Sequence, residues 1–183
     1  MATLTLANQL TLVRLLLVPV LVILVIYGYP GWALITFIIA GVTDGLDGLI
    51  ARRSGGPTKL GALLDPMADK LLLVSTFVVL TMPGLDLVNR LPIWLTVLVI
   101  SRDVIIVLTV AVVNLALERF TFPPSSLGKI ATFVYILTGS LTLLFNYLGR
   151  PSVLVDVAIW AALAVTLASG FHYIVHAARL VNR

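Results

Sequence analysis

The chain has 183 residues, of which 60% are hydrophobic and only 11% are charged, with a formal net charge of +4. Soluble domains carry about 25% charged residues, so this composition and the mean hydropathy of +1.13 exclude a soluble globular protein. The chain has no cysteine, which excludes disulfides, thiolate catalysis and cysteine-ligated metal. We therefore expect an integral membrane protein, with one domain over residues 1–183 and no nucleic-acid partner.

Six apolar runs predict an all-α bundle of six transmembrane helices. A short interfacial helix is expected over residues 2–10, and no cleaved signal peptide, because no cationic start precedes the first run. Each run approaches or exceeds the roughly 20 residues that a helix needs to cross a bilayer. Turns rich in Gly, Pro and charged residues separate the runs. In chain order the runs cover residues 11–27, 32–52, 60–82, 93–117, 127–148 and 153–180.

The distribution of Lys and Arg predicts the orientation of the bundle. An even number of spans places both termini on one side, and this side collects most of the Lys and Arg residues. Because cytoplasmic loops are rich in Lys and Arg, we expect both termini to face the cytoplasm. The cations of that side are Arg14, Arg52, Arg53, Lys59, Arg119, Lys129, Arg179 and Arg183, against Arg90 and Arg150 on the other.

Half of the eight acidic residues lie between positions 44 and 69, within sequence apolar enough for a membrane. Asp44 and Asp47 share one helix face, and Asp65 and Asp69 share another, because residues three and four apart lie on one side of a helix. The short turn between the two runs makes the helices antiparallel, so four carboxylates can line one cleft. Carboxylates in a membrane segment are costly and usually functional, and all-oxygen ligation suits Mg²⁺, Mn²⁺ or Ca²⁺. The alternative is a structural cluster in which these carboxylates pair with Arg52, Arg53, Lys59 and Lys70.

Small residues accompany these carboxylates. Gly48 and Ala51 lie on the face of Asp44, and Gly61 lies on the face of Asp65. Such residues permit close helix packing, and beside carboxylates they also leave room for a ligand.

The pattern Asp44-x-x-Asp47-Gly48-x-x-Ala51-Arg52, followed after eight residues by Gly61-x-x-x-Asp65-x-x-x-Asp69, resembles the signature of the CDP-alcohol phosphatidyltransferases. Six predicted helices and the N-x-L-T segment at residues 8–11 are also similar to this family. The resemblance implies a homodimeric enzyme of the bacterial cytoplasmic membrane, with its active site facing the cytoplasm. It would transfer a phosphatidyl group from CDP-diacylglycerol to an alcohol and release CMP.

The resemblance also implies roles for individual residues. Asp44, Asp47 and Asp65 would hold one Mg²⁺ or Mn²⁺ ion, and Asp44, Asp65 and Asp69 a second. Asp69 would also be the general base. CDP-diacylglycerol would contact Asn8, Thr11, Gly48, Ala51, Arg52, Thr58 and Gly61.

The acceptor alcohol is less defined. The segment LDPMADKLL is similar to phosphatidylglycerophosphate synthases, which use glycerol 3-phosphate, and this acceptor is our first choice. Arg102 and Lys129 are the candidate acceptor-binding cations; their alternatives are a self-neutralised pair with Asp103 and an interfacial anchor. Val110 and Ala131 stand where those synthases have further cations, and the Arg-Asp wording is similar to cardiolipin synthases, which use phosphatidylglycerol. More distant alternatives are an intramembrane prenyltransferase and a cation transporter.

Overall fold

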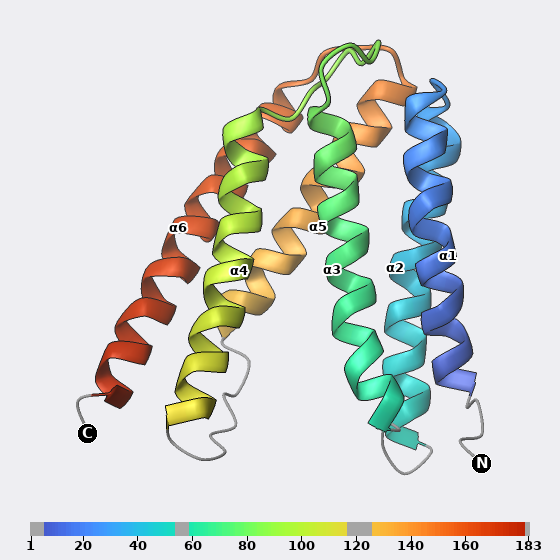
Figure 1. The fold of residues 1–183 in the computed structure, drawn as a ribbon. Coiled ribbons are helices and arrows are strands. Elements are labelled where there is room, and N and C mark those ends of the chain that lie inside the picture. Colours follow the sequence, from blue (N-terminus) through green and yellow to red (C-terminus); the bar gives the residue numbers. More distant parts are fainter. Residues whose placement is uncertain (1–5, 54–58, 117–125, 182–183) are drawn as a thin grey trace. The chain divides into compact units, whose positions relative to one another are not determined.

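The computed structural model describes the backbone of residues 6–53, 59–116 and 126–181, and within it the side chains of residues 9–44, 67–108 and 127–173. This part of the chain contains six α-helices and no strand, which confirms the all-α prediction (Figure 1). The helices are α1 (Leu6–Ile26), α2 (Pro30–Arg53), α3 (Lys59–Thr81), α4 (Ile93–Ala116), α5 (Ser126–Tyr147) and α6 (Val153–Val181).

The first helix differs from its prediction. An interfacial helix over residues 2–10 was expected to precede a span from residue 11, but α1 is one continuous helix from Leu6 onward. No Pro or Gly separates residues 6–10 from the following apolar run, so nothing in the sequence interrupts the helix there. Residues 1–5 lie outside the described part. Pro19 is accommodated within α1.

Within the described residues, three helices contain stretches long and apolar enough to cross a membrane: Gln9–Ile26, Leu127–Tyr147 and Val153–Tyr173. Large apolar side chains point outward from them, including Leu16, Phe133 and Phe171, which are 69%, 67% and 72% exposed. Threonine hydroxyls donate to backbone carbonyls one turn earlier, as Thr76 does to Leu72 and Thr138 to Val134, so these polar groups are satisfied within their own helices. These helices fit a protein of the membrane.

The chain divides into two compact units, and α5 contributes to both. The first unit contains α1, α2, α3 and the end of α5 from Gly139, and the second contains α4, the beginning of α5 and α6. Whether they form the single predicted domain stays a prediction.

In the first unit, α1 packs against α2 and α3, which also contact each other. The buried face of α1 includes Thr11, Arg14, Leu21 and Val25, spaced as one stripe of a helix. Gly139 of α5 packs closely against α2 and α3: a Cβ added at this glycine would lie 3.4 Å from side-chain atoms of both Phe37 and Thr76. Among the described side chains, the core of this unit is therefore mostly apolar; its buried polar groups include Thr11 and Arg14 on α1, threonines such as Thr76, and Asn89 and Asn146.

Two helix ends in this unit are closed in the same way. Gly28 follows α1 with a φ of 76°; its N–H donates to Val25 O, and Tyr29 N–H donates to Leu24 O. This is a Schellman motif, in which a left-handed glycine turns the chain out of the helix. Gly149 ends α5 in the same way, with a φ of 64°.

A reciprocal asparagine pair fastens the α3–α4 turn to the end of α5. Asn89 N–H donates to Asn146 Oδ1 at 2.8 Å, and Asn146 Nδ2 donates to Asn89 O at 2.9 Å. Asn89 Nδ2 also donates to Arg150 O at 2.9 Å. Both asparagines are buried, and each hydrogen bond satisfies a polar group that would be costly to leave unpaired.

In the second unit, α4 packs against α6. Leu95 and Val99 of α4 are buried, as are Val155 and Ala162 of α6. Near the start of α4, the rings of Trp94 and Trp160 lie 6.0 Å apart between centroids. The unit also contains Arg102 and Lys129, the two cations that are predicted from the sequence to bind the acceptor.

Candidate active site

Two of the signature carboxylates meet on a single cation. Asp44 lies in the second half of α2 and Asp69 near the middle of α3, and Arg14 lies on the buried face of α1. Arg14 Nη1 is 2.9 Å from Asp44 Oδ1 and 2.5 Å from Asp69 Oδ1. One terminal nitrogen of the guanidinium therefore bridges carboxylates from two helices.

The exposure of the three side chains differs. The Arg14 side chain is 0% exposed, while those of Asp44 and Asp69 are 44% and 39% exposed. The guanidinium thus forms the inner wall of the site, and the carboxylates are the groups that a ligand from outside meets first. A buried cation is costly unless it is paired and hydrogen-bonded, and charge-assisted hydrogen bonds to carboxylates are among the strong ones.

The carboxylate pair suits a small hard cation. Asp44 Oδ1 and Asp69 Oδ1 both contact Arg14 Nη1, so the distance between the two oxygens cannot exceed the sum of their distances to that nitrogen. The positive charge of the guanidinium already lies between them. Oxygen ligands of this type are those preferred by Mg²⁺ and Mn²⁺. Among the described side chains, no group of three or more acidic or histidine residues is close enough to bind metal; Asp47 and Asp65 lie outside these side chains.

The predicted CDP-diacylglycerol contacts are only partly described. Thr11 is fully buried, one turn before Arg14 on the same face of α1. The other predicted contacts lie in regions whose side chains or backbone are not described: Asn8, Gly48, Ala51, Arg52, Thr58 and Gly61.

Arg14 is the site residue that sequence reasoning missed. The sequence pattern offers Arg52, Arg53, Lys59 and Lys70 as partners of the carboxylates. It places Arg14 only among the cations of the cytoplasmic side. The missed signal was the one applied to the Asp residues: a charged side chain in an apolar helix needs an opposite charge. Its position one turn after Thr11, on a stripe with Leu21, also indicated a buried face.

Arg102 lies in the second unit with its own anion. Its side chain is 9% exposed, and Nη1 donates to Asp103 Oδ1 at 2.7 Å. Nε donates to Ser169 Oγ on α6 at 3.1 Å. Among the described residues Nη2 makes no hydrogen bond, so the guanidinium keeps a donor for a further anion. Lys129, in the first turns of α5, is exposed.

Further hydrogen bonds of the second unit lie next to Arg102. Ser169 Oγ, which accepts from Arg102, donates to Thr166 O at 3.1 Å. Thr166 Oγ1 donates to Ala162 O, so the Tyr135 hydroxyl donates to Thr166 Oγ1, at 2.7 Å. These bonds tie α5 to α6 close to the arginine and restrict the positions it can take.

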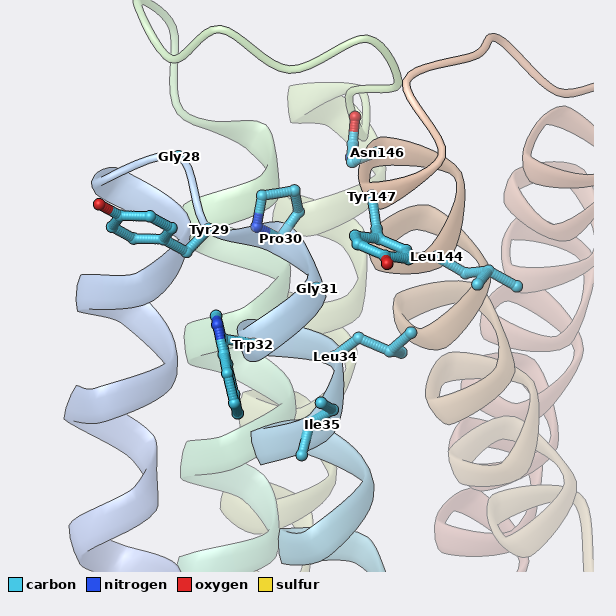
Figure 2. Close-up of a pocket in the computed structure, with 10 residues that line it drawn as sticks. All are labelled: Gly28, Tyr29, Pro30, Gly31, Trp32, Leu34, Ile35, Leu144, Asn146 and Tyr147. Atoms are coloured by element: carbon cyan, nitrogen blue, oxygen red, sulfur yellow. The ribbon is translucent and has the colours of Figure 1, made fainter.

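A surface hollow of about 760 Å³ occupies the opposite end of α2 (Figure 2). It is lined mainly by apolar and aromatic side chains, and Tyr29, Trp32 and Tyr147 surround it. At 1.5 Å per residue, Gly31 lies roughly 20 Å along α2 from Asp44. The hollow is therefore separate from the carboxylate site.

The chain is similar to known proteins over most of its length. The sequence model of one family, CDP-alcohol phosphatidyltransferase, matches residues 4–168. A "Probable phosphatidylglycerophosphate synthase" of Mycobacterium tuberculosis is 38% identical over 183 residues, covering 95% of this chain and 82% of the relative. A "Cardiolipin synthase (CMP-forming)" of Streptomyces coelicolor is 37% identical over 98% of this chain and 85% of its own. The Bacillus subtilis "CDP-diacylglycerol--glycerol-3-phosphate 3-phosphatidyltransferase" is 33% identical, over 92% of each.

Proposed function

The chain belongs to the CDP-alcohol phosphatidyltransferase family, and from this premise we propose that it transfers the phosphatidyl group of CDP-diacylglycerol to glycerol 3-phosphate. The products are phosphatidylglycerophosphate and CMP. The observation that carries the proposal is the meeting of Asp44 and Asp69, at two of the family's signature positions, on one buried cation. The relatives from M. tuberculosis and B. subtilis, with the names given above, support the same acceptor.

In this mechanism the acceptor hydroxyl attacks the phosphorus that carries diacylglycerol. The new bond joins that phosphorus to the acceptor oxygen, and the bond that breaks joins it to the CMP oxygen. Asp69 receives the hydroxyl proton, and CMP leaves with the electron pair of the broken bond. The partial exposure of Asp69 supports this role, because a general base needs to come within hydrogen-bond reach of the substrate.

The carboxylates also define the ligand set. We propose that Asp44, Asp47, Asp65 and Asp69 hold two Mg²⁺ or Mn²⁺ ions, which when bound would neutralise the diphosphate and the departing CMP. Arg14 fixes Asp44 and Asp69 from behind and keeps them directed toward the open side of the site. The donor would be bound through Asn8, Thr11, Gly48, Ala51, Arg52, Thr58 and Gly61, as the family signature implies.

For the membrane arrangement we propose six spans in one domain, with both termini and the active site on the cytoplasmic side of the bacterial inner membrane. Asp44 lies far along α2, whereas Tyr29 and Trp32 lie at its beginning, an arrangement typical of a helix with an aromatic interface at one end. A carboxylate site near the cytoplasmic surface allows a water-soluble acceptor to enter while the lipid tails stay in the bilayer. We further propose a homodimer, as the family resemblance implies.

The acceptor phosphate is assigned to Arg102 and Lys129. Arg102 is held by Asp103 and Ser169 and retains Nη2 as a donor toward a phosphate oxygen. Such fixed guanidinium groups suit phosphate recognition. Since Asp103 already neutralises much of its charge, we expect Arg102 to contribute orientation more than net attraction.

Phosphatidylglycerol is the second candidate acceptor. The observation that favours it is the 37% identity with the Streptomyces coelicolor protein, whose name is cardiolipin synthase (CMP-forming). With this acceptor the same atoms react, and the product is cardiolipin.

The test is an acceptor panel with the purified enzyme in lipid nanodiscs. CDP-diacylglycerol and Mg²⁺ or Mn²⁺ are supplied with glycerol 3-phosphate, phosphatidylglycerol, inositol phosphate or serine, and CMP and the lipid product are measured by mass spectrometry. We expect CMP release and phosphatidylglycerophosphate with glycerol 3-phosphate. Cardiolipin formation from phosphatidylglycerol alone would replace the first acceptor by the second, and no CMP release with any alcohol would refute the transferase proposal.

A further inference from the structure

Arg14 places a permanent positive charge inside a site that is expected to bind divalent ions. Its guanidinium contacts Asp44 at 2.9 Å and Asp69 at 2.5 Å, and its side chain is fully buried. We expect the arginine to stay in place when ligands bind to these carboxylates, because a fully buried guanidinium without its anionic partners would be costly.

This arrangement sets the charge of the site. The four carboxylates proposed as ligands and the guanidinium carry a net charge of −3 together, so two divalent ions leave the group with a charge of +1. A positive site favours an anion as the next ligand, and the donor of the proposed reaction carries a diphosphate. Without Arg14, the four carboxylates would neutralise the two divalent ions fully and hold them without help from the donor.

We propose that Arg14 is a built-in counter-cation that couples metal binding to donor binding. It keeps the two carboxylates together in the absence of metal, and it weakens their affinity for free divalent ions. Metal and the diphosphate of the liponucleotide then bind with positive cooperativity. This inference rests on the proposed function and adds to it an order of events: metal binds tightly only together with the donor.

The experiment measures Mn²⁺ binding by electron paramagnetic resonance, in the purified protein, with and without CDP as a soluble diphosphate probe. The variant Arg14→Gln removes the charge, and Arg14→Lys keeps it. Arg90→Gln is the control, because it removes an exposed arginine of the turn between α3 and α4, which donates to Leu85 O of the same turn and belongs to no proposed binding site.

For the wild type we expect weak Mn²⁺ binding that CDP strengthens. In Arg14→Gln, Mn²⁺ alone should bind about tenfold tighter or more, because a like charge at contact distance is lost, and CDP should add little. Arg14→Lys and Arg90→Gln should keep the wild-type affinity and the CDP effect. Thermal unfolding of Arg14→Gln should also shift more on addition of Mn²⁺ than that of the wild type.

The opposite outcomes are distinct. If Arg14→Gln binds Mn²⁺ no more tightly than the wild type, Arg14 only aligns the carboxylates and the inference is wrong. Should Arg14→Gln fail to fold, Arg14→Lys decides: loss of the CDP effect with the charge retained refutes the counter-cation role. If the wild type binds no Mn²⁺ with or without CDP, the metal-dependent function itself fails, independently of Arg14.

Discussion

Replacement of Asp69 by Asn tests the proposed general base directly. The change keeps the size of the side chain and leaves an oxygen that can still accept a hydrogen bond from Arg14 Nη1, now 2.5 Å from Asp69 Oδ1. It removes the negative charge and the ability to take a proton. Asp69→Asn should therefore abolish turnover while binding of the liponucleotide largely survives.

The expected magnitudes follow from the surroundings of Asp69. A hydrogen bond to a charged group contributes about 1.5–3 kcal/mol, and replacing the carboxylate by an amide oxygen removes part of this contribution. The Asp69 side chain is 39% exposed and Arg14 keeps Asp44, so screening by solvent reduces the loss of stability to about 1 kcal/mol. The loss of general-base catalysis alone should lower kcat by roughly 100- to 10,000-fold.

The assay follows CMP release from CDP-diacylglycerol with saturating glycerol 3-phosphate, together with thermal unfolding and liponucleotide binding. Asp86→Asn is the matched control, because Asp86 is an exposed carboxylate in the turn between α3 and α4 and should change neither rate nor stability appreciably. If Asp69→Asn binds the donor and retains more than a tenth of the wild-type kcat, Asp69 is not the base.

Two further changes test the packing of the first unit and the acceptor site. Gly31→Ala should lower the free energy of unfolding by about 1–3 kcal/mol, because its Cβ would lie 2.6 Å from the Tyr147 ring; Gly41→Ala, which meets nothing within 4 Å, should be neutral or stabilising in the same thermal unfolding assay. Arg102→Ala should raise the KM for glycerol 3-phosphate about tenfold or more and leave the KM for the liponucleotide nearly unchanged. A hydrogen bond to a charged group contributes at least about 1.5 kcal/mol, which corresponds to about tenfold in affinity. An unchanged KM for glycerol 3-phosphate would show that Arg102 forms only a structural ion pair with Asp103.

The helices were predictable because their signal is local. Each apolar run between Gly- and Pro-containing turns became one helix, and the largest differences are at the ends. α2 begins at Pro30 instead of residue 32, since proline suits the first turn of a helix, where its missing N–H costs nothing. Residues 6–10 form no separate helix for a related reason: they contain no residue that ends a helix, so they continue into α1.

The site was predictable only as far as one helix face. Spacing placed Asp44 with Asp47 and Asp65 with Asp69, but the approach of α1 to both helices is a tertiary contact. The bond from Arg14 to Asp69 joins residues 55 apart in sequence, and no periodicity reports such a separation. The number of bound ions and the identity of the acceptor are still harder to predict from the sequence, because they depend on side chains from several helices.

Arg14 shows how charge balance could have closed part of this gap. The rule that a carboxylate in an apolar segment needs a cation applies in both directions, so Arg14 and the four carboxylates should have been considered as one group. Loop cations near water have little need of a partner, because solvent already stabilises them. A cation on the buried stripe of α1 has no such alternative, and a carboxylate from a neighbouring helix is the partner that lowers its cost most. In a chain with only eight acidic residues, the half that clusters between positions 44 and 69 was therefore where Arg14 had to find its partners.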